Sequence, residues 1–198
     1  MGKKTSPFAF RHFIVHHDRC SMKIGTDAVL LGAWTRVAGA KTMLDIGTGS
    51  GILALMLAQR ASPEARIDAL EIAQPDFLQA NENARHSPWP EKIKVHPTSI
   101  QAYRTKTKYD LIVCNPPYFI NSLLPASPSR KLARHTTSLS NSDLLSAVKR
   151  LLSDQAHSLL FSPLLRAFNL NPWQKDPVCI AHDVLHSFRE SKSHRNGG

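Results

Sequence analysis

Apolar residues in this chain gather in short runs that are separated by glycine, proline and polar residues. Short apolar runs between turn residues are typical of strands buried on both faces, and longer segments with capping residues predict helices. The expected strands are residues 42–46, 66–71, 92–96, 111–114 and 157–161, and the expected helices are residues 28–34, 52–60, 75–85 and 141–152. This alternation predicts an α/β fold, a Rossmann-like sheet with helices on both faces.

The length of 198 residues suits one such domain and is too short for two ordinary ones. Residues 1–40 precede the first clear strand, and we expect them to form an N-terminal extension packed on the main domain. The main domain is expected over residues 41–186, followed by a polar, basic tail over residues 187–198. After the fifth expected strand only residues 177–181 form a further apolar run, so the C-terminal part of the sheet could be incomplete.

The chain carries a formal net charge of +10, from 25 Lys and Arg against 15 Asp and Glu. This excess favours a polyanionic partner, because binding phosphate groups releases counterions. The longest uninterrupted apolar run, residues 52–58, is far shorter than a membrane span. We therefore expect either a polyanionic partner or a merely soluble basic protein, and no membrane association.

The cysteines give no sign of a disulfide framework or a zinc site. Cys20, Cys114 and Cys179 are far apart and include no C-x-x-C pair, which favours a reducing, cytoplasmic setting. His16 and His17 stand beside Asp18, but neighbouring residues on a strand point in opposite directions and no second cluster completes a site. No metal is expected.

A glycine-rich turn follows the first expected strand. It contains Gly47, Gly49 and Gly51, and Asp45 lies just before it in the strand. Glycines let the backbone turn sharply and approach a ligand closely, and the following helix offers free N–H groups. Glu71 ends the second expected strand, where a carboxylate can accept hydrogen bonds from both hydroxyls of a ribose. These residues predict a ribose-containing ligand at the carboxyl ends of the first two strands.

The fourth expected strand runs into Asn115, Pro116, Pro117 and Tyr118. Two prolines make a stiff turn, which presents the Asn115 amide oxygen and the Pro116 carbonyl as acceptors, and Tyr118 adds a flat ring. Two acceptors and an aromatic ring suit a planar amino group attached to a heteroaromatic ring. The turn is therefore a candidate site for methylation of such an amine.

Three further positions could contact a ligand. Thr26 and Asp27 stand at the predicted start of a helix, where they are expected to form a turn and an N-cap. Ile100, beyond the third expected strand, could lie against a flat ring or could equally be a core residue.

The order of these parts resembles the class I S-adenosylmethionine-dependent methyltransferases. Within that class, residues 13–27, FIVHHDRCSMKIGTD, and residues 30–34, LLGAW, closely resemble the bacterial tRNA(Val) adenine-N6 methyltransferases, which modify adenine 37 beside the anticodon. Residues 87–93, SPWPEKI, and residues 133–137, ARHTT, extend the likeness, which covers roughly residues 8–162.

The resemblance implies S-adenosyl-L-methionine as the cofactor and an anticodon-loop adenine of tRNA as the methyl acceptor. It places the cofactor at the glycine turn, with Asp45 and Glu71, and the target amine at residues 115–118. The family usually has an acid at the position of Ser99, where the adenine amine of the cofactor is met. Because a neutral hydroxyl accepts more weakly than a carboxylate, we expect a cost of about 1 kcal/mol.

The candidate contacts to nucleic acid are basic or titratable residues in two segments: Arg11, Arg19, Arg130, Lys131, Arg134 and His135. An N-P-P-Y turn also serves methylation of DNA adenine or cytosine and of protein glutamine, so these substrates remain alternatives. A third alternative is an RNA-binding relative that has lost turnover through its shortened C-terminus. The N-terminal likeness favours tRNA methylation.

Overall fold

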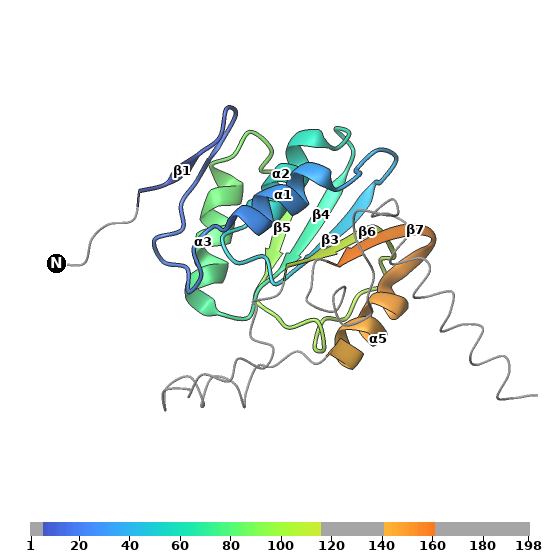
Figure 1. The fold of residues 1–198 in the computed structure, drawn as a ribbon. Helices are drawn as coiled ribbons and strands as arrows, with labels where there is room; N and C mark the ends of the chain where they lie inside the picture. Colours follow the sequence, from blue (N-terminus) through green and yellow to red (C-terminus); the bar gives the residue numbers. More distant parts are fainter. Residues whose placement is uncertain (1–5, 116–140, 161–198) are drawn as a thin grey trace, which may run out of the picture.

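The computed structural model describes residues 6–115 and 141–160 (Figure 1). Its central sheet has five parallel strands in the order β5-β4-β3-β6-β7. The strands are β3 (Thr42–Ile46), β4 (Arg66–Leu70), β5 (Ile93–His96), β6 (Tyr109–Cys114) and β7 (Leu152–Leu160), and a hairpin is formed by β1 (Phe8–Ala9) and β2 (Ile14–Val15). The helices are α1 (Thr26–Trp34), α2 (Ile52–Arg60), α3 (Gln74–Arg85) and α5 (Asn141–Leu151).

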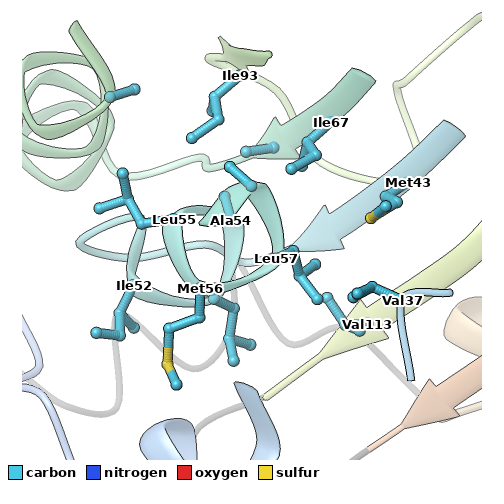
Figure 2. Close-up of a cluster of buried hydrophobic side chains, with 14 of the residues drawn as sticks. Val37, Met43, Ile52, Ala54, Leu55, Met56, Leu57, Ile67, Ile93 and Val113 are labelled. Atoms are coloured by element: carbon cyan, nitrogen blue, oxygen red, sulfur yellow. The ribbon is translucent and has the colours of Figure 1, made fainter. Parts of the chain in front are cut away.

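Side chains that alternate along the strands build a core on each face of the sheet. Met43, Ile67 and Val113 face α2 and join one core cluster, which Figure 2 shows with Leu55 and Leu57 of the helix. The intervening residues form the second cluster, in which Leu44 and Ile112 pack with Leu144, Val148 and Leu151 of α5. The expected Rossmann-like sheet, with helices on both faces, is therefore confirmed (Figure 1).

Most predicted boundaries agree with the structure to within one residue. Three starts differ by more, and one of them is that of β6, which begins at Tyr109 and not at residue 111. The helix expected from residue 28 begins at Thr26, after Gly25, and no side chain caps its first turn. The expected N-cap at residues 26–27 was therefore wrong, because both residues already belong to the helix. The last strand begins at Leu152, five positions before the predicted start at His157, directly after α5.

The N-terminal segment packs on α3 through two buried polar side chains. Asp76 accepts hydrogen bonds from the Ser21 backbone N–H at 2.9 Å and from its hydroxyl at 2.7 Å. Asn83 accepts from the His16 backbone N–H at 3.0 Å and donates to the His16 carbonyl at 2.7 Å. Both side chains are largely shielded from water, and their hydrogen bonds tie residues 16 and 21 to α3.

The His17 ring links two parts of the N-terminal segment by hydrogen bonds to their backbone. Its Nδ1 accepts a hydrogen bond from the Ile24 N–H at 3.1 Å, so its proton is on Nε2, which donates to the Ser6 carbonyl at 3.1 Å. Lys23 closes the same turn by donating from Nζ to the carbonyls of His17, Asp18 and Cys20. In the described ranges no group of three or more His, Cys, Asp or Glu side chains could hold a metal ion.

Several of the residues and segments named from the sequence lie outside the described ranges: Pro116, Pro117, Tyr118, Arg130, Lys131, Arg134, His135, the possible strand at 177–181 and the tail at 187–198. Within the part of the chain that the structure describes, no helix is long and apolar enough to cross a membrane.

Candidate active site at the carboxyl edge of the sheet

Three neighbouring strands end at the same level of the sheet. Ile46, the last residue of β3, is in register with Leu70 of β4 on one side and Cys114 of β6 on the other. The next residues along the chain are Gly47, Glu71 and Asn115, so the glycine turn, the acid and the amide meet at one edge. Strand order also reverses beside β3, and open α/β sheets bind ligands at such a switch point.

The glycine turn needs backbone angles that other residues adopt with strain. Gly47, Gly49 and Gly51 have φ angles of 71°, 56° and 83°, all in the left-handed region. A Cβ built on Gly47 or Gly49 would meet no atom within 4 Å, so open space lies beside both residues. The turn is held to β4 because the N–H groups of Gly47 and Thr48 donate to the Leu70 carbonyl at 2.9 and 3.0 Å.

Glu71 is almost fully buried and binds backbone from two loops. Its Oε2 accepts from the Gly49 N–H at 2.9 Å, and its Oε1 accepts from the N–H groups of Ile72 and Ala73 at 2.8 and 2.9 Å. The side chain is 9% exposed, which differs from a solvated acid at a strand end. Since each carboxylate oxygen has two lone pairs, Oε2 keeps capacity for a ligand hydroxyl.

Asp45 lies beneath the turn, fully shielded from water. Its Oδ2 accepts a hydrogen bond from the Thr48 hydroxyl at 2.6 Å. Burial raises the pKa of Asp45 to about 7, the Thr48 bond and the Ala54 N–H at the start of α2 oppose this rise, and the charge of Glu71 adds to it. The Ala54 N–H is near the carboxyl group, but Asp45 Oδ1 forms no hydrogen bond with any described residue.

Asn115 is joined to the first turn of α1. Its Nδ2 donates a hydrogen bond to Asp27 Oδ2 at 2.8 Å, although the two residues are 88 positions apart. The Asn115 Oδ1 is buried and accepts no hydrogen bond from any described residue. The site therefore holds a buried acceptor at the end of β6, next to the glycine turn.

Ser99 and Ile100 follow β5, at the far side of β4 from the glycine turn. The Ser99 Oγ accepts from the Ala102 N–H at 3.2 Å, so it already closes a local turn. Ile100 is 3% exposed and packs in the second core cluster with Leu70 and Tyr103. Their contacts with a cofactor stay predictions.

The two described arginines of the expected nucleic-acid surface differ in their environment. Arg11 is exposed in the loop that joins β1 to β2. Arg19 is also exposed, but its Nη1 forms an ion pair with Glu82 Oε2 at 2.8 Å, so a phosphate would have to compete with that carboxylate. The basic residues between positions 130 and 135 fall outside the described ranges.

Two residues of this edge were missed from the sequence. Asn83 donates a hydrogen bond from Nδ2 to the Ser50 carbonyl at 2.8 Å, which ties the glycine turn to α3 and the N-terminal segment. Ile72 follows Glu71 and is 48% exposed, which leaves an apolar face beside the acid. A large apolar residue directly after a strand-end acid was a readable signal, whereas nothing in the sequence marks Asn83.

The comparisons with known proteins agree with this geometry. Residues 21–137 match the methyltransferase small domain. The chain belongs to that methyltransferase family. This confirms the class expected from the order of the glycine turn, the strand-end acid and the N-P-P-Y turn.

Two curated relatives carry a more specific name. The chain is 50% identical over 188 residues to the tRNA1(Val) (adenine(37)-N6)-methyltransferase of Aeromonas hydrophila, covering 94% of this chain and 76% of the relative. It is 48% identical over 165 residues to the protein of the same name from Trichodesmium erythraeum, covering 82% and 69%. The closer resemblance seen in residues 13–27 and 30–34 is therefore confirmed.

A solved structure shares the fold at low sequence identity. The S-adenosylmethionine-dependent methyltransferase from Thiobacillus denitrificans, solved with S-adenosyl-L-homocysteine, superposes with a TM-score of 0.50 at 16% identity. The match covers 73% of this chain and 49% of that one, so the chain spans about half of its length. At this identity the likeness concerns the fold alone.

Proposed function

We propose that this protein is an S-adenosylmethionine-dependent tRNA methyltransferase that methylates the exocyclic amine of an anticodon-loop adenine, adenine 37 of tRNA(Val). The observation that carries the proposal is the alignment of Gly47, Glu71 and Asn115 at three adjacent strand ends. In this alignment a glycine turn, a buried acid and a buried amide oxygen lie side by side, and we assign the acid to the ribose of the cofactor. The names of two relatives at 50% and 48% identity support the same substrate.

The residues present fit S-adenosylmethionine. Gly47 and Gly49 border open space in which a Cβ would meet nothing, so a ligand can approach the backbone there. Glu71 Oε2 retains a lone pair for a ribose hydroxyl, and Ile72 offers an apolar face for a flat ring. The buried Asp45 lacks a partner at Oδ1 among the described residues and adds an acceptor below the turn. When bound, the cofactor supplies a methyl group made electrophilic by its sulfonium.

Asn115 is assigned to the methyl acceptor. The exocyclic nitrogen of adenine is a weak nucleophile because its lone pair is delocalised into the ring. A hydrogen bond from this amine to Asn115 Oδ1 and a second to the Pro116 carbonyl favour a tetrahedral nitrogen with a directed lone pair. Tyr118 would stack on the base, and no general base is required before transfer because the methylated nitrogen readily releases its proton. The roles of residues 116–118 are predictions from the sequence.

The charge of the chain suits tRNA. Its net charge of +10 favours a polyanion, and an anticodon loop lets a base leave its stack at lower cost than a duplex does. Arg11, Arg130, Lys131, Arg134 and His135 remain candidate backbone contacts, and Arg19 would first have to leave Glu82. A tRNA substrate supports a cytoplasmic location. We retain the division into an extension at 1–40, the methyltransferase domain at 41–186 and a tail at 187–198.

The direct test offers radiolabelled S-adenosylmethionine with total tRNA, with DNA and with protein in separate reactions. We expect label only in tRNA, and mapping of the product should place it on the N6 of adenine 37. Label in DNA or protein would assign a different substrate, and no transfer to any of the three would contradict the proposed activity. In parallel, affinity for tRNA should fall with rising salt.

Asn115→Ala should lower turnover by ~10²-fold or more, because one oriented contact to the reacting group is lost. Its affinity for S-adenosyl-L-homocysteine should stay near that of the wild type. Asn81→Ala on α3 is the matched control and should keep full turnover. Near-normal turnover by Asn115→Ala would remove Asn115 from the site.

A further inference from the structure

The hydrogen bond between Asn115 and Asp27 fixes which end of the amide faces the reaction. A carboxylate offers only acceptors, so it must be met by the NH₂ end of the asparagine side chain. Asn115 Nδ2 lies 2.8 Å from Asp27 Oδ2, and Oδ1 is thereby turned the other way. That Oδ1 is buried and without a partner in the described residues, so it is available as an acceptor.

The backbone around Asp27 makes room for this contact. Gly25 precedes α1, and a Cβ at this position would collide with Asp27 Oδ1. Glycine is therefore needed there for steric reasons while the carboxylate turns toward β6, because the Gly25 φ of −100° would be ordinary for any residue. This steric requirement explains why glycine stands at position 25, which capping does not explain, since no side chain caps α1.

The helix that carries Asp27 is held firmly. Leu31 is 1% exposed in the main core, and the Arg60 side chain of α2 donates from Nη1 to the Gly32 carbonyl at 2.7 Å. Thr35 closes the last turn with its hydroxyl on the Leu31 carbonyl at 2.6 Å. A group on such an anchored element can orient a partner with little loss of entropy.

We propose that Asp27 is a positioning residue for methyl transfer, which holds the Asn115 amide so that its oxygen receives the target amine. This inference rests on the proposed function of Asn115. The Asp27 carboxylate also strengthens Asn115 Oδ1 as an acceptor, because a hydrogen bond from Nδ2 to a carboxylate polarises the amide. Asp27 acts through Asn115, which differs from the direct ligand contact expected from the sequence.

Turnover and cofactor affinity separate these two roles. Asp27→Ala should lower kcat by ~10-fold to 10²-fold, while the Kd for S-adenosyl-L-homocysteine, measured by calorimetry, changes less than about threefold. Asp27→Asn keeps an acceptor oxygen for Asn115 Nδ2 and should recover part of kcat. Asp18→Ala removes an exposed acid from the neighbouring segment and should leave both quantities unchanged. A Kd that weakens in parallel with kcat/KM would overturn the positioning role and make Asp27 a cofactor ligand.

A double-mutant cycle tests whether Asp27 acts through Asn115. The variant that carries both Asp27→Ala and Asn115→Ala should be no slower than Asn115→Ala alone, because the amide that Asp27 orients is already gone. Additive losses would contradict the proposal. Gly25→Ala should displace the Asp27 carboxylate and lower kcat, as Asp27→Ala does. Full activity in Gly25→Ala would also contradict the positioning role of Asp27.

A spectroscopic measurement keeps the inference separate from the activity. In the isotopically labelled full chain, the Asn115 side-chain NH₂ resonances should shift in Asp27→Ala and stay in place in Asp18→Ala. A chain that transferred no methyl group would contradict the proposed function, yet these resonances would still report the contact. Unchanged Asn115 resonances in Asp27→Ala would overturn the inference whatever the activity.

Discussion

Glu71 Oε2 accepts a hydrogen bond from the Gly49 N–H at 2.9 Å, and this bond joins two loops that are 22 positions apart in the sequence. The other oxygen of Glu71 holds the N–H groups of Ile72 and Ala73. One carboxylate therefore shapes both the glycine turn after β3 and the start of the loop after β4. Any ligand that binds Glu71 meets an acid already fixed in place.

Glu71→Gln should weaken binding of S-adenosyl-L-homocysteine by about tenfold or more and lower the melting temperature. In the wild type both oxygens of Glu71 accept from backbone N–H groups, and the glutamine NH₂ group would replace one of them. At least one buried N–H is then left without an acceptor, at a cost of ~1–3 kcal/mol. Calorimetry and thermal unfolding measure the two effects. Glu91→Gln, an exposed change with the same chemistry, is the control, and equal behaviour of the two variants would contradict the role of Glu71.

Asp45 should make the protein less stable as the pH rises. Burial raises its pKa from 3.8 to about 7, so the folded state holds the proton more tightly than the unfolded chain does. The resulting stabilisation is full below about pH 4 and is lost as the pH rises to about 7, with a slope of at most ~1.4 kcal/mol per pH unit. Asp45→Asn stays neutral, so its stability relative to wild type should increase across this range and level off above it.

Denaturant unfolding at several pH values measures this difference, and Asp110→Asn is the contrast. Burial works against ionisation of Asp110, but the N–H groups of Lys41 and Thr42 outweigh it and lower its pKa. Asp110 therefore stabilises the fold at neutral pH and loses that contribution as the pH falls. A pH-independent difference between Asp45→Asn and wild type would show that Asp45 is ionised in the folded protein at all these pH values.

Tyr109→Phe should destabilise the protein by ~1–3 kcal/mol, because it breaks a series of linked hydrogen bonds within the second core cluster. The Tyr109 hydroxyl donates to Asp68 Oδ2 at 2.7 Å and therefore accepts from the Tyr103 hydroxyl at 2.9 Å. His96 donates from Nε2 to Asp68 Oδ1 at 2.6 Å. The Tyr103 hydroxyl is the first donor in this series, so Tyr103→Phe removes only the hydrogen bond to Tyr109 and should lower the free energy of unfolding by less. Equal losses of unfolding free energy in the two variants would contradict this order.

Ser99→Asp should tighten binding of S-adenosyl-L-homocysteine, since a carboxylate would accept from its adenine amine with a charge-assisted bond. The Ser99 Oγ already accepts from the Ala102 N–H, and aspartate can keep that bond with its second oxygen. Calorimetry on the variant and the wild type measures the change. Unchanged or weaker binding would mean that residue 99 does not meet the adenine.

Asn83→Ala should destabilise the protein and weaken cofactor binding together. The Asn83 side chain accepts a hydrogen bond from the His16 N–H and donates to the His16 and Ser50 carbonyls. Its loss leaves these groups unpaired at a cost of ~2–4 kcal/mol. Asn81→Ala on the same helix is the control for helix propensity. A stable variant with normal affinity would show that the N-terminal segment and the glycine turn are held independently.

The central elements could be predicted because their apolar runs end sharply at turn residues. Residues 42–46 and 52–60 were predicted with the bounds of β3 and α2. The early residues of β7, Ser153 to Gln155, are polar, so the pattern placed the start of that strand too late. Propensity and periodicity describe buried apolar positions well and say little about a polar strand end.

The site could be predicted only as far as residue type reveals a role. A glycine, an acid and an amide after the first, second and fourth expected strands made Gly47, Glu71 and Asn115 candidates. The contacts that hold them were not predictable, since Glu71 binds backbone N–H groups and every residue except proline has one. Asp27 and Asn115 are 88 positions apart, and no local signal links them.

The order of strands also determines when the site is assembled as the chain is made. The glycine turn and Glu71 belong to a continuous stretch that contains β3, α2 and β4, whereas Asn115 arrives only with β6 on the other side of β3. Lys41 and Asp110, which join these strands by a hydrogen bond, are 69 positions apart. Because synthesis proceeds from the N-terminus and distant pairings form slowly, a nascent chain first builds the half with the glycine turn. Until β6 emerges from the ribosome, one edge of β3 is unpaired, and the N–H and C=O groups of that edge can pair with another chain, which favours aggregation.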